Sequence, residues 1–405
     1  MIGGSLTGVP DVIVIGAGVV GASTAHALAE AGASVVVLDA GGVGAGTSAA
    51  TFAVDITRVK TPRALFDLSL ASAAEHAALQ AVCAGRGWRH QAATLEWEST
   101  EPDRQRLRDR VERVPGWGCP ARWLARSEIR ALEPALATRF GEKAEIAFYP
   151  DGGWYEPDVF VHALLNRAQR KGSALHLHDS VTGMRIVCGR ITQLRTLSGA
   201  RFSADAVVNC AGPQADDVAA LGGAEVPLRR VPGLVVTTTP VPNGLRTILA
   251  TPDLNLRPHV AGRVMLHSWL LDRELPGTDA GQRHALAGDL MERARKLLPG
   301  IARAGVHSVR VGFRPVPPDG LPVVGHLDGV ANLYTVVSHS AVHLAPILGR
   351  LAAHELIGSP QERLDPFRPA RFTHSPAPTA AVDENTRTML ARIGTEDGSE
   401  AADVG

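Results

Sequence analysis

Three glycines near the start of the chain occur at the spacing G-x-G-x-x-G, in Gly16-Ala17-Gly18-Val19-Val20-Gly21. The apolar, β-branched run Asp11–Ile15 precedes them, and an alanine-rich stretch with apolar residues at helical spacing, Val19–Ala31, follows them. In such a strand-to-helix turn, the first glycine permits the tight turn, the second lets the backbone approach a pyrophosphate, and the third allows close helix–strand packing. The N–H groups at the start of the helix then face the anion. The pattern therefore predicts a site for a dinucleotide pyrophosphate.

An acidic residue stands where such a site needs one. The second buried strand, Ser34–Leu38, ends directly before Asp39, which lies 23 positions after Gly16. Its carboxylate can accept hydrogen bonds from ribose hydroxyls and would repel a 2′-phosphate. NAD and FAD units share this pattern. The following segment, Gly44-Ala45-Gly46-Thr47-Ser48, supplies small residues and hydroxyls that can approach the same pyrophosphate and a ring beyond it, which favours FAD.

Further helices and strands must position these residues. The periodicity predicts helices at 65–82, 103–113, 158–171, 281–298 and 345–357. It predicts further strands at 174–178, 206–210, 234–239, 264–267 and 333–337. After Phe372 the composition becomes polar, and we expect a loosely ordered tail there.

Composition limits the classes of function. The 405 residues carry 41 Lys+Arg and 41 Asp+Glu, so no basic excess indicates a nucleic-acid partner. The four cysteines are scattered, which favours a reduced, cytoplasmic compartment over a zinc or disulfide framework. We expect no metal site. The chain start has no basic region, and no apolar run is long enough to predict a membrane span.

The glycine motif with Gly44–Ser48 resembles the amino-terminal signature of the D-amino-acid oxidase superfamily of flavoproteins, which includes glycine oxidase, sarcosine oxidase and the D-amino-acid dehydrogenases. The resemblance continues to about residue 372. The further matching segments are Gly152–Pro157, Asp179–Val181, Val207–Pro213, Gly312–Pro315 with Asp319–Pro322 and Gly325, and Ser338–Ser340 with Leu344–Pro346.

This resemblance implies an α/β fold with a Rossmann-like FAD-binding domain and a second α+β substrate domain carrying a mostly antiparallel sheet. The FAD-binding domain would be discontinuous, formed by residues 1–75, 151–225 and 310–372. Residues 76–150 and 226–309 would form the substrate domain, and 373–405 a flexible tail.

The resemblance also implies an enzyme that oxidises the C–N bond of an amino acid or secondary amine carrying a carboxylate. Hydride would pass from the α-carbon to flavin N5, giving an imine that hydrolyses. The substrate would be a small molecule or a carrier-bound amino acid, and the enzyme an oxidase or a dehydrogenase. Three alternatives stay open: a flavoprotein dehydrogenase of a 2-hydroxy acid, a flavin-binding subunit without chemistry of its own, and an NAD-dependent dehydrogenase.

Arg314 and His339 are the expected catalytic residues. A guanidinium can hold a substrate carboxylate by two parallel hydrogen bonds, although an interdomain salt bridge is the alternative for Arg314. His339 would act near the flavin pyrimidine edge, mainly through the backbone that leads into the following helix. The expected cofactor-binding residues are Gly16, Gly18, Val19, Val20, Gly21, Asp39, Ala40, Gly46, Thr47, Ser48, Val181, Cys210, Ala211, Gly212, Arg314, Ser338, His339, Ser340, Ala341 and Val342.

The chain also departs from the family pattern. Sarcosine oxidases join flavin to a cysteine in the last third of the chain, but no cysteine follows Cys210, so we expect non-covalent FAD. Asn255 stands near the place of a tyrosine that often binds the substrate carboxylate. An unusual substrate is therefore expected, such as a secondary amine, an imino acid or a carrier-bound amino acid.

Overall fold

The computed structural model describes residues 11–83, 85–137, 140, 144–372 and 383–393. Within them, a six-stranded sheet has the order β18-β19-β12-β1-β2-β8. Its strands are β1 (Val12–Ile15), β2 (Val35–Leu38), β8 (Ala174–His176), β12 (Ala206–Asn209), β18 (Val323–His326) and β19 (Leu333–Val337). All neighbours are parallel except the pair β18–β19. The fully buried β-branched residues of β1 explain its central place, because a parallel strand is covered on both faces.

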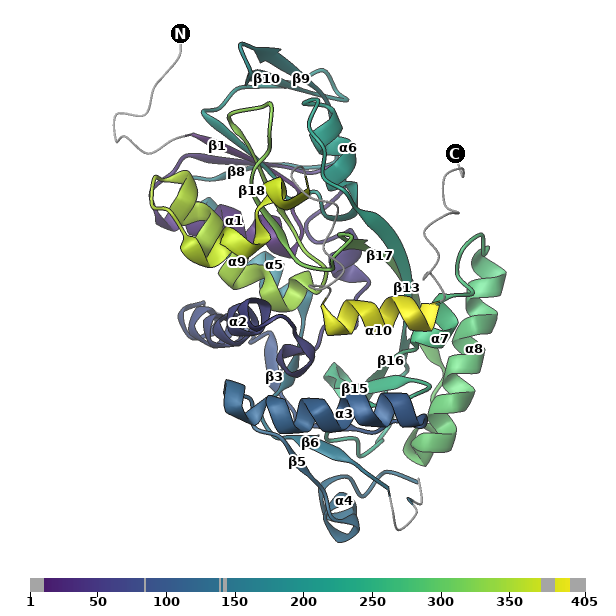
Figure 1. The fold of residues 1–405 in the computed structure, drawn as a ribbon. Coiled ribbons are helices and arrows are strands. Elements are labelled where there is room, and N and C mark those ends of the chain that lie inside the picture. The colour runs from purple at the N-terminus through teal and green to yellow at the C-terminus, as the bar shows by residue number, and fades with distance from the viewer. Residues whose placement is uncertain (1–10, 84, 138–139, 141–143, 373–382, 394–405) are drawn as a thin grey trace.

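Helices and a small sheet cover the two faces of this parallel sheet (Figure 1). On one face, α1 (Val19–Glu30) packs between α5 (Pro157–Arg170) and α9 (Ala341–Leu356), with α2 (Arg63–Val82) against α9. On the other face lie α6 (Ala215–Ala220) and an antiparallel sheet of β9 (Val181–Val187), β10 (Arg190–Thr196) and β11 (Arg201–Phe202). The carboxyl ends of β1, β2 and β12 therefore meet at one edge, where the glycine turn begins.

A second, mixed sheet has the order β17-β13-β16-β15-β14-β4-β6-β5. Its strands are β4 (Thr94–Glu96), β5 (Arg122–Trp123), β6 (Ala147–Tyr149), β13 (Arg229–Thr238), β14 (Ile248–Ala250), β15 (Asn255–His259), β16 (Arg263–His267) and β17 (Val306–Val316). Neighbours are antiparallel except β14–β4. Helix α8 (Ala280–Leu297) buries Leu290 and Met291 in the core on one side of this sheet.

Helix α9 begins at Ala341, four residues before the expected start, although it contains Pro346. Proline has no N–H to donate to the carbonyl four residues earlier, that of Val342. His76 Nε2 lies 3.0 Å from that carbonyl oxygen and replaces the missing donor. Trp88 Nε1 donates to His76 Nδ1 over 3.2 Å, which leaves the hydrogen on Nε2. A buried histidine on α2 thus lets the helix extend to the turn at residues 338–340.

The expectation of a loose tail after Phe372 is wrong for residues 383–393. Asp383 is fully buried, and Glu384–Ile393 form helix α10, whose Met389 is fully buried against Val231 and Val316. The polar composition concealed this helix because only one of its faces is apolar. The other parts of the predicted tail, 373–382 and 394–405, lie outside the described residues.

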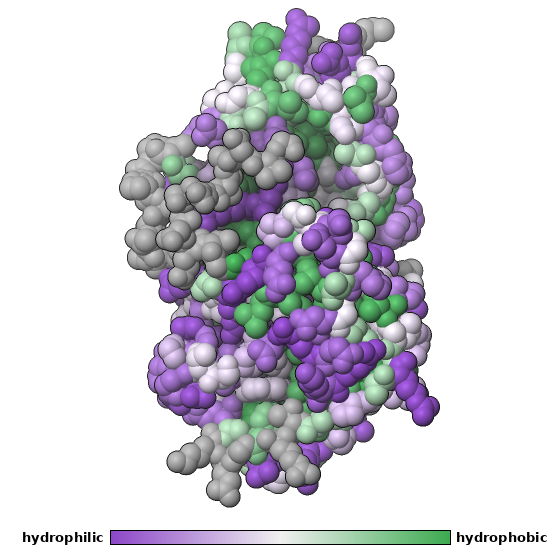
Figure 2. Space-filling view, turned by 90° about the vertical axis from the view of Figure 1, so that its right-hand side faces the viewer, coloured by the Kyte–Doolittle hydropathy of each residue, from purple (hydrophilic) through white to green (hydrophobic). Residues whose placement is uncertain are grey.

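Helix α10 crosses the molecule beside α7 (Trp269–Asp272) and above α3 (Glu101–Arg113) (Figure 1). The face that carries α8 and α10 shows mainly hydrophilic side chains, with smaller apolar patches between them (Figure 2). None of the helices in the described part of the chain combines the length and apolar character that a membrane span requires.

Candidate functional site

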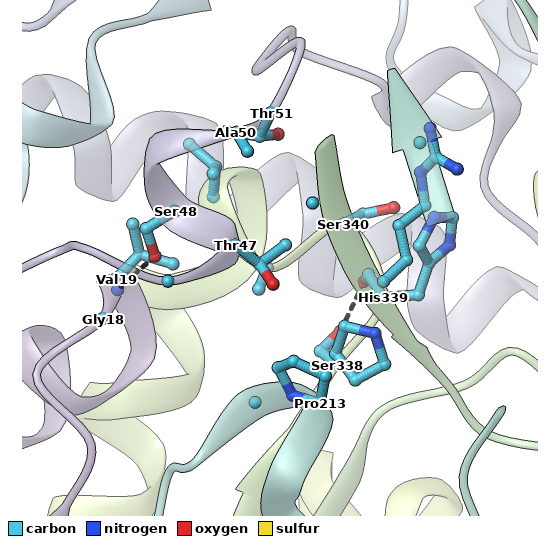
Figure 3. A pocket seen from close by; sticks show the side chains of 18 of the residues that line it. Gly18, Val19, Thr47, Ser48, Ala50, Thr51, Pro213, Ser338, His339 and Ser340 are labelled. Atoms are coloured by element: carbon cyan, nitrogen blue, oxygen red, sulfur yellow. Dashed lines mark hydrogen bonds between the residues drawn. The ribbon is translucent and has the colours of Figure 1, made fainter. Parts of the chain in front are cut away.

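A cavity of about 770 Å³ lies between the two sheets. The carboxyl ends of β1, β2, β12 and β19 line one side, and β13, β15, β16 and β17 line the other. Of the residues predicted from the sequence, all except Gly21 line this cavity. Gly18, Val19 and Ser48 lie at one part of it, and Ser338, His339 and Ser340 at another (Figure 3). The fold therefore gathers segments that are more than 300 positions apart in the chain.

At two positions of the glycine turn, a side chain would clash with the neighbouring backbone. A Cβ on Gly16, whose φ is +111°, would lie 2.4 Å from Cys210 O. A Cβ on Gly21 would lie 1.8 Å from Gly16 O, so Gly21 allows α1 to pack on the turn and does not itself face the cavity. Both contacts hold β1, α1 and β12 closer together than any other residue type permits.

The start of α1 is open toward the cavity. Gly18 is the N-cap and supplies no side-chain acceptor, and Val19 N donates to Ser48 Oγ over 3.2 Å (Figure 3). The first-turn N–H groups of a helix carry partial positive charge and lack partners within the helix. A pyrophosphate fits this position, with the hydroxyl of Ser48 beside it.

Asp39 stands at the end of β2 and lines the cavity. Its Oδ2 accepts from Ala17 N over 2.6 Å and its Oδ1 from Gly41 N over 2.7 Å. These bonds tie the carboxylate to the glycine turn, a contact that the sequence did not indicate. Each oxygen retains a lone pair for a hydroxyl donor, so a ribose fits beside Asp39.

The turn before α9 follows β19 and lines a different part of the cavity from the glycine turn (Figure 3). Ser340 is the N-cap of α9 with φ +65°, and Lys60 Nζ donates to its Oγ over 3.1 Å. His339 is buried, and Thr386 Oγ1 lies 3.4 Å from its Nδ1. Burial lowers the pKa of His339 well below its usual value, and Lys60 and Arg314 add to this effect. His339 is therefore neutral, and the positive end of α9 supplies the favourable field for an electron-rich ring edge.

Arg314 lines the cavity, but its charge is already matched. Its Nη2 donates to Asp272 Oδ2 over 2.8 Å, and its Nη1 to Pro232 O over 2.7 Å. The guanidinium also lies over the Trp269 ring, 4.8 Å from the centroid. Its Nη2 also lies 3.0 Å from His267 Nε2, so three of its five N–H groups face protein partners and the other two can still donate to a carboxylate.

Asp272 is fully buried and also holds His267, whose Nε2 lies 3.1 Å from Asp272 Oδ2. Asn255 Nδ2 lies 3.3 Å from His267 Nδ1, and Arg314 Nη2 lies 3.0 Å from His267 Nε2. A hydrogen on Nε2 satisfies Asn255 and Asp272, whereas Arg314 can donate only to an Nε2 without hydrogen. Burial opposes ionisation of Asp272, but Arg314 and His267 outweigh it and keep the carboxyl pKa below its usual value. The sequence motif located Arg314 but gave no sign of Asp272.

One wall of the cavity consists of residues that we did not predict. They come from four segments of the chain. The residues are Arg58 before α2, Glu96 and Glu98 in and after β4, Arg110 on α3, and Asn385, Thr388 and Arg392 on α10. Glu96 and Glu98 stand two positions apart, and alternation along a strand places such side chains on one face. That spacing was the available signal, but it did not identify the arginines that pair with them.

The donors and acceptors of this cavity therefore fit FAD. The helix start at α1 suits the pyrophosphate, Asp39 suits the ribose, and the turn at residues 338–342 suits the ring. Cys210 lines the cavity beside them, but burial raises the pKa of its thiol to about 12. Within the described residues, no group of three or more His, Cys, Asp or Glu side chains is arranged to hold a metal ion.

Known proteins share this arrangement. A family model described as FAD dependent oxidoreductase matches residues 11–355. Hydrogen cyanide synthase subunit HcnC of Pseudomonas aeruginosa is 26% identical over 333 residues, covering 79% of this chain and 78% of that protein. The glycine oxidase of Geobacillus kaustophilus is 27% identical over 355 residues, covering 85% and 92%.

A crystal structure of glycine oxidase from Geobacillus kaustophilus superposes with a TM-score of 0.79 at 25% identity, covering 89% of this chain and 98% of the other. The residues that the family model matches include both sheets and most of the residues that line the cavity. This chain belongs to the family of FAD-dependent oxidoreductases related to glycine oxidase and D-amino-acid oxidase.

Proposed function

We propose that this enzyme oxidises the C–N bond of an amino acid or secondary amine that carries a carboxylate, giving an imine. FAD, when bound, supplies the acceptor for the hydride of the substrate α-carbon. The observation that carries the proposal is Arg314, which lies at the cavity with N–H groups still available and faces the same space as the turn at Ser338–Ser340.

Arg314 would fix the substrate carboxylate and thereby the face of the α-carbon that is presented for oxidation. Its position is rigid because Pro232 O and Asp272 hold two of its nitrogens, and Trp269 supports the guanidinium plane. Asn255 and His267, which also line the cavity, would add polar contacts near the same carboxylate. Precise positioning of this kind is the main catalytic contribution that the protein makes.

For the cofactor, we propose contacts that follow the motifs. The start of α1 with Thr47 and Ser48 would hold the pyrophosphate, and Asp39 the ribose. Val181 and the backbone of Cys210–Gly212 would line the adenine side. We propose non-covalent binding, because the buried Cys210 thiol is directed at Thr24, with Sγ 3.9 Å from its Oγ1.

We also propose that the parallel sheet, with residues 1–75, 151–225 and 310–372, is the FAD-binding domain, and that 76–150 and 226–309 form the substrate domain. Helix α10 and the residue before it contact both parts, through Met389 against Val231 and through Asp383 against Lys60. All four cysteines are free, which supports a cytoplasmic location. We propose a free small amine as the substrate, because a carrier-bound amino acid would also need space for its carrier beside the cavity.

Anaerobic reduction of the bound flavin tests the proposal. The purified holoenzyme is mixed with D-, L- and N-alkyl amino acids and with matched 2-hydroxy acids, and absorbance near 450 nm is followed. We expect bleaching by at least one amine and release of ammonia or an amine on turnover. Bleaching by hydroxy acids alone would assign the hydroxy-acid reaction instead. If no compound of either class bleaches the flavin, the chain is a flavin-binding subunit without amine chemistry.

A further inference from the structure

Helix α10 forms part of the cavity wall. Asn385, Thr388 and Arg392 line the cavity, and their spacing of three and four residues places them on one face of the helix. Arg387 lies on the solvent-exposed side. The family model ends at residue 355, so this face is a feature of the chain beyond the segment that the family model matches.

A buried ion pair fixes α10 to the turn that faces the cavity. Lys60 Nζ lies 3.0 Å from Asp383 Oδ2, and both side chains are fully buried. The same Nζ donates to Ser340 Oγ, and Asp383 also accepts from Thr61 N. The loop before β18 leaves room for the helix, because a Cβ on Gly320 would lie 2.5 Å from Thr386 Oγ1. These contacts make α10 an integral part of the site.

The apolar face of α10 connects it to Arg314. Met389 is buried with Val231 and Val316, and Leu390 and Ile393 pack in the same cluster with Trp269. The guanidinium of Arg314 also lies over the Trp269 ring, 4.8 Å from its centroid. Trp269 therefore contacts both α10 and Arg314, and Arg314 and the cavity face of α10 line the same cavity.

The wall around α10 is rich in guanidinium groups. Arg110 pairs with Glu96 and with Glu384, and Arg58 also pairs with Glu96. Arg113 pairs with Glu384, so this cluster contains three arginines and two glutamates. Arg58 and Arg110 contribute to the cavity lining, whereas Glu384 and Arg113 do not.

Arg392 lies outside that cluster. Its Nη2 donates to both carboxylate oxygens of Glu98, over 2.8 and 2.9 Å, and lies 4.0 Å from Asp103 Oδ1. Asn385 and Thr388 add neutral N–H and O–H donors to this wall. The arginine cluster, with three arginines and two glutamates, has one positive charge in excess. Such a surface favours an anion that accepts several hydrogen bonds. A substrate as small as glycine has no second group to place there.

We infer that Asn385, Thr388 and Arg392 form a subsite for a second carboxylate of the substrate. The inference rests on the proposed function and assigns its substrate class: an amino acid or secondary amine with two carboxylates. One carboxylate lies at Arg314 and the other at α10, and the oxidised C–N bond lies between these sites.

Paired substrates that differ only in the second carboxylate test this inference. Suitable pairs are iminodiacetate with N-methylglycine, and glutamate with 2-aminopentanoate. For each pair, the ratio of kcat/KM for the dicarboxylate to that for the monocarboxylate is measured in the holoenzyme. We expect a ratio above about 10, and Arg392→Gln should lower it by about 10- to 100-fold, the effect of losing a hydrogen bond to a charged group. Thr388→Val should lower it by a smaller factor.

Arg387→Ala is the matched control, because this arginine is on the same helix but does not line the cavity. The ratio should stay at the value of the unsubstituted enzyme. Arg392→Gln leaves Glu98 without its partner, so the double variant Glu98→Gln/Arg392→Gln is measured as well. The inference is overturned if both Arg392 variants fold, bind FAD and keep the original ratio, or if monocarboxylates are preferred throughout.

A binding measurement separates this inference from the proposed function. Glutarate and butyrate are titrated into the oxidised holoenzyme, and the flavin difference spectrum gives their Kd. We expect tighter binding of glutarate, with a preference that is lost in Arg392→Gln. Equal affinities would reject the subsite even if amines reduce the flavin. A glutarate preference in an enzyme that no amine reduces would keep the subsite and reject the amine reaction.

Discussion

Asp272→Asn should strengthen carboxylate binding at Arg314. Asp272 is fully buried and 2.8 Å from Arg314 Nη2, so a bound ligand carboxylate meets a guanidinium that is already neutralised. Two carboxylates on opposite sides of one guanidinium are about 6 Å apart, and at an effective dielectric constant of about 20 their repulsion is about 3 kcal/mol. Removing the charge of Asp272 should therefore lower the Kd of a carboxylate ligand by up to about 100-fold.

The side chain of asparagine preserves much of the local structure. Its Oδ1 can still accept from Leu234 N, which bonds to Asp272 Oδ1 over 2.8 Å, but its Nδ2 cannot accept from Arg314 Nη2, so that hydrogen bond is lost. The folded protein should nevertheless lose about 3 kcal/mol of stability, because the guanidinium loses its ion-pair partner. Ligand binding should restore part of this loss, so the melting temperature of the variant should rise more steeply with carboxylate concentration than that of the unsubstituted protein.

The assay is a titration of acetate and butyrate into oxidised holoenzyme, followed by the flavin difference spectrum at constant ionic strength. Arg314→Ala is the opposite control and should weaken binding by about 2–5 kcal/mol. The double variant Arg314→Ala/Asp272→Asn also removes the repulsion from Asp272, so it should bind the ligand more tightly than Arg314→Ala but more weakly than Asp272→Asn. If Asp272→Asn folds, binds FAD and leaves the Kd unchanged, Arg314 is a structural partner of Asp272 and does not contact the ligand.

Three further results are expected. Gly21→Ala should displace α1 from the glycine turn, which should cost about 1–3 kcal/mol of stability and lower the affinity for FAD. Urea unfolding and flavin release measure the two effects. Gly288→Ala is the control and should change neither, because its Cβ would meet open space. Burial lowers the pKa of His76 from 6.5 to about 3, so the unfolded state takes up a proton first as pH falls. Protonation of His76 in the unfolded state should therefore lower the free energy of unfolding by about 2 kcal/mol between pH 7 and pH 5. The free energy of unfolding of His76→Gln should fall less over this pH range, and an equal fall would contradict the prediction. Lys60→Met should cost about 3–5 kcal/mol by leaving the buried Asp383 unpaired, and Lys60→Met/Asp383→Asn should cost less; equal losses would show that the two charges do not interact.

Local pattern predicted most of the elements around the cofactor. The strand expected at 333–337 is β19 with the same bounds, and the helices expected at 65–82, 103–113, 158–171 and 281–298 are α2, α3, α5 and α8. Each of these helices buries apolar residues in a core, and the spacing of those residues in the sequence predicted the helix. The glycine spacing was equally informative, since close backbone contact at Gly16 and Gly21 excludes other residues.

Partners that meet only in the folded chain were not predictable. Asp272 and Arg314 lie 42 positions apart, and nothing in either local sequence reveals the pair. Helix α10 reads as a polar tail because its cavity face is hydrophilic, and its anchor, Asp383, pairs with a lysine 323 positions earlier. Helix α9 begins four residues before the predicted start, and the side chain of His76, on a distant helix, contacts the Val342 carbonyl oxygen that Pro346 cannot reach.

The central position of β1 has a consequence for biosynthesis. Val12 pairs with Val35 on one side but with Ala206 on the other, and the strand beyond, β19, is among the last to leave the ribosome. For about half of translation, β1 therefore has an unpaired apolar edge, which favours misassembly and binding by chaperones. Slowing elongation before residue 206 should therefore lower the yield of native holoprotein more than slowing it after residue 340.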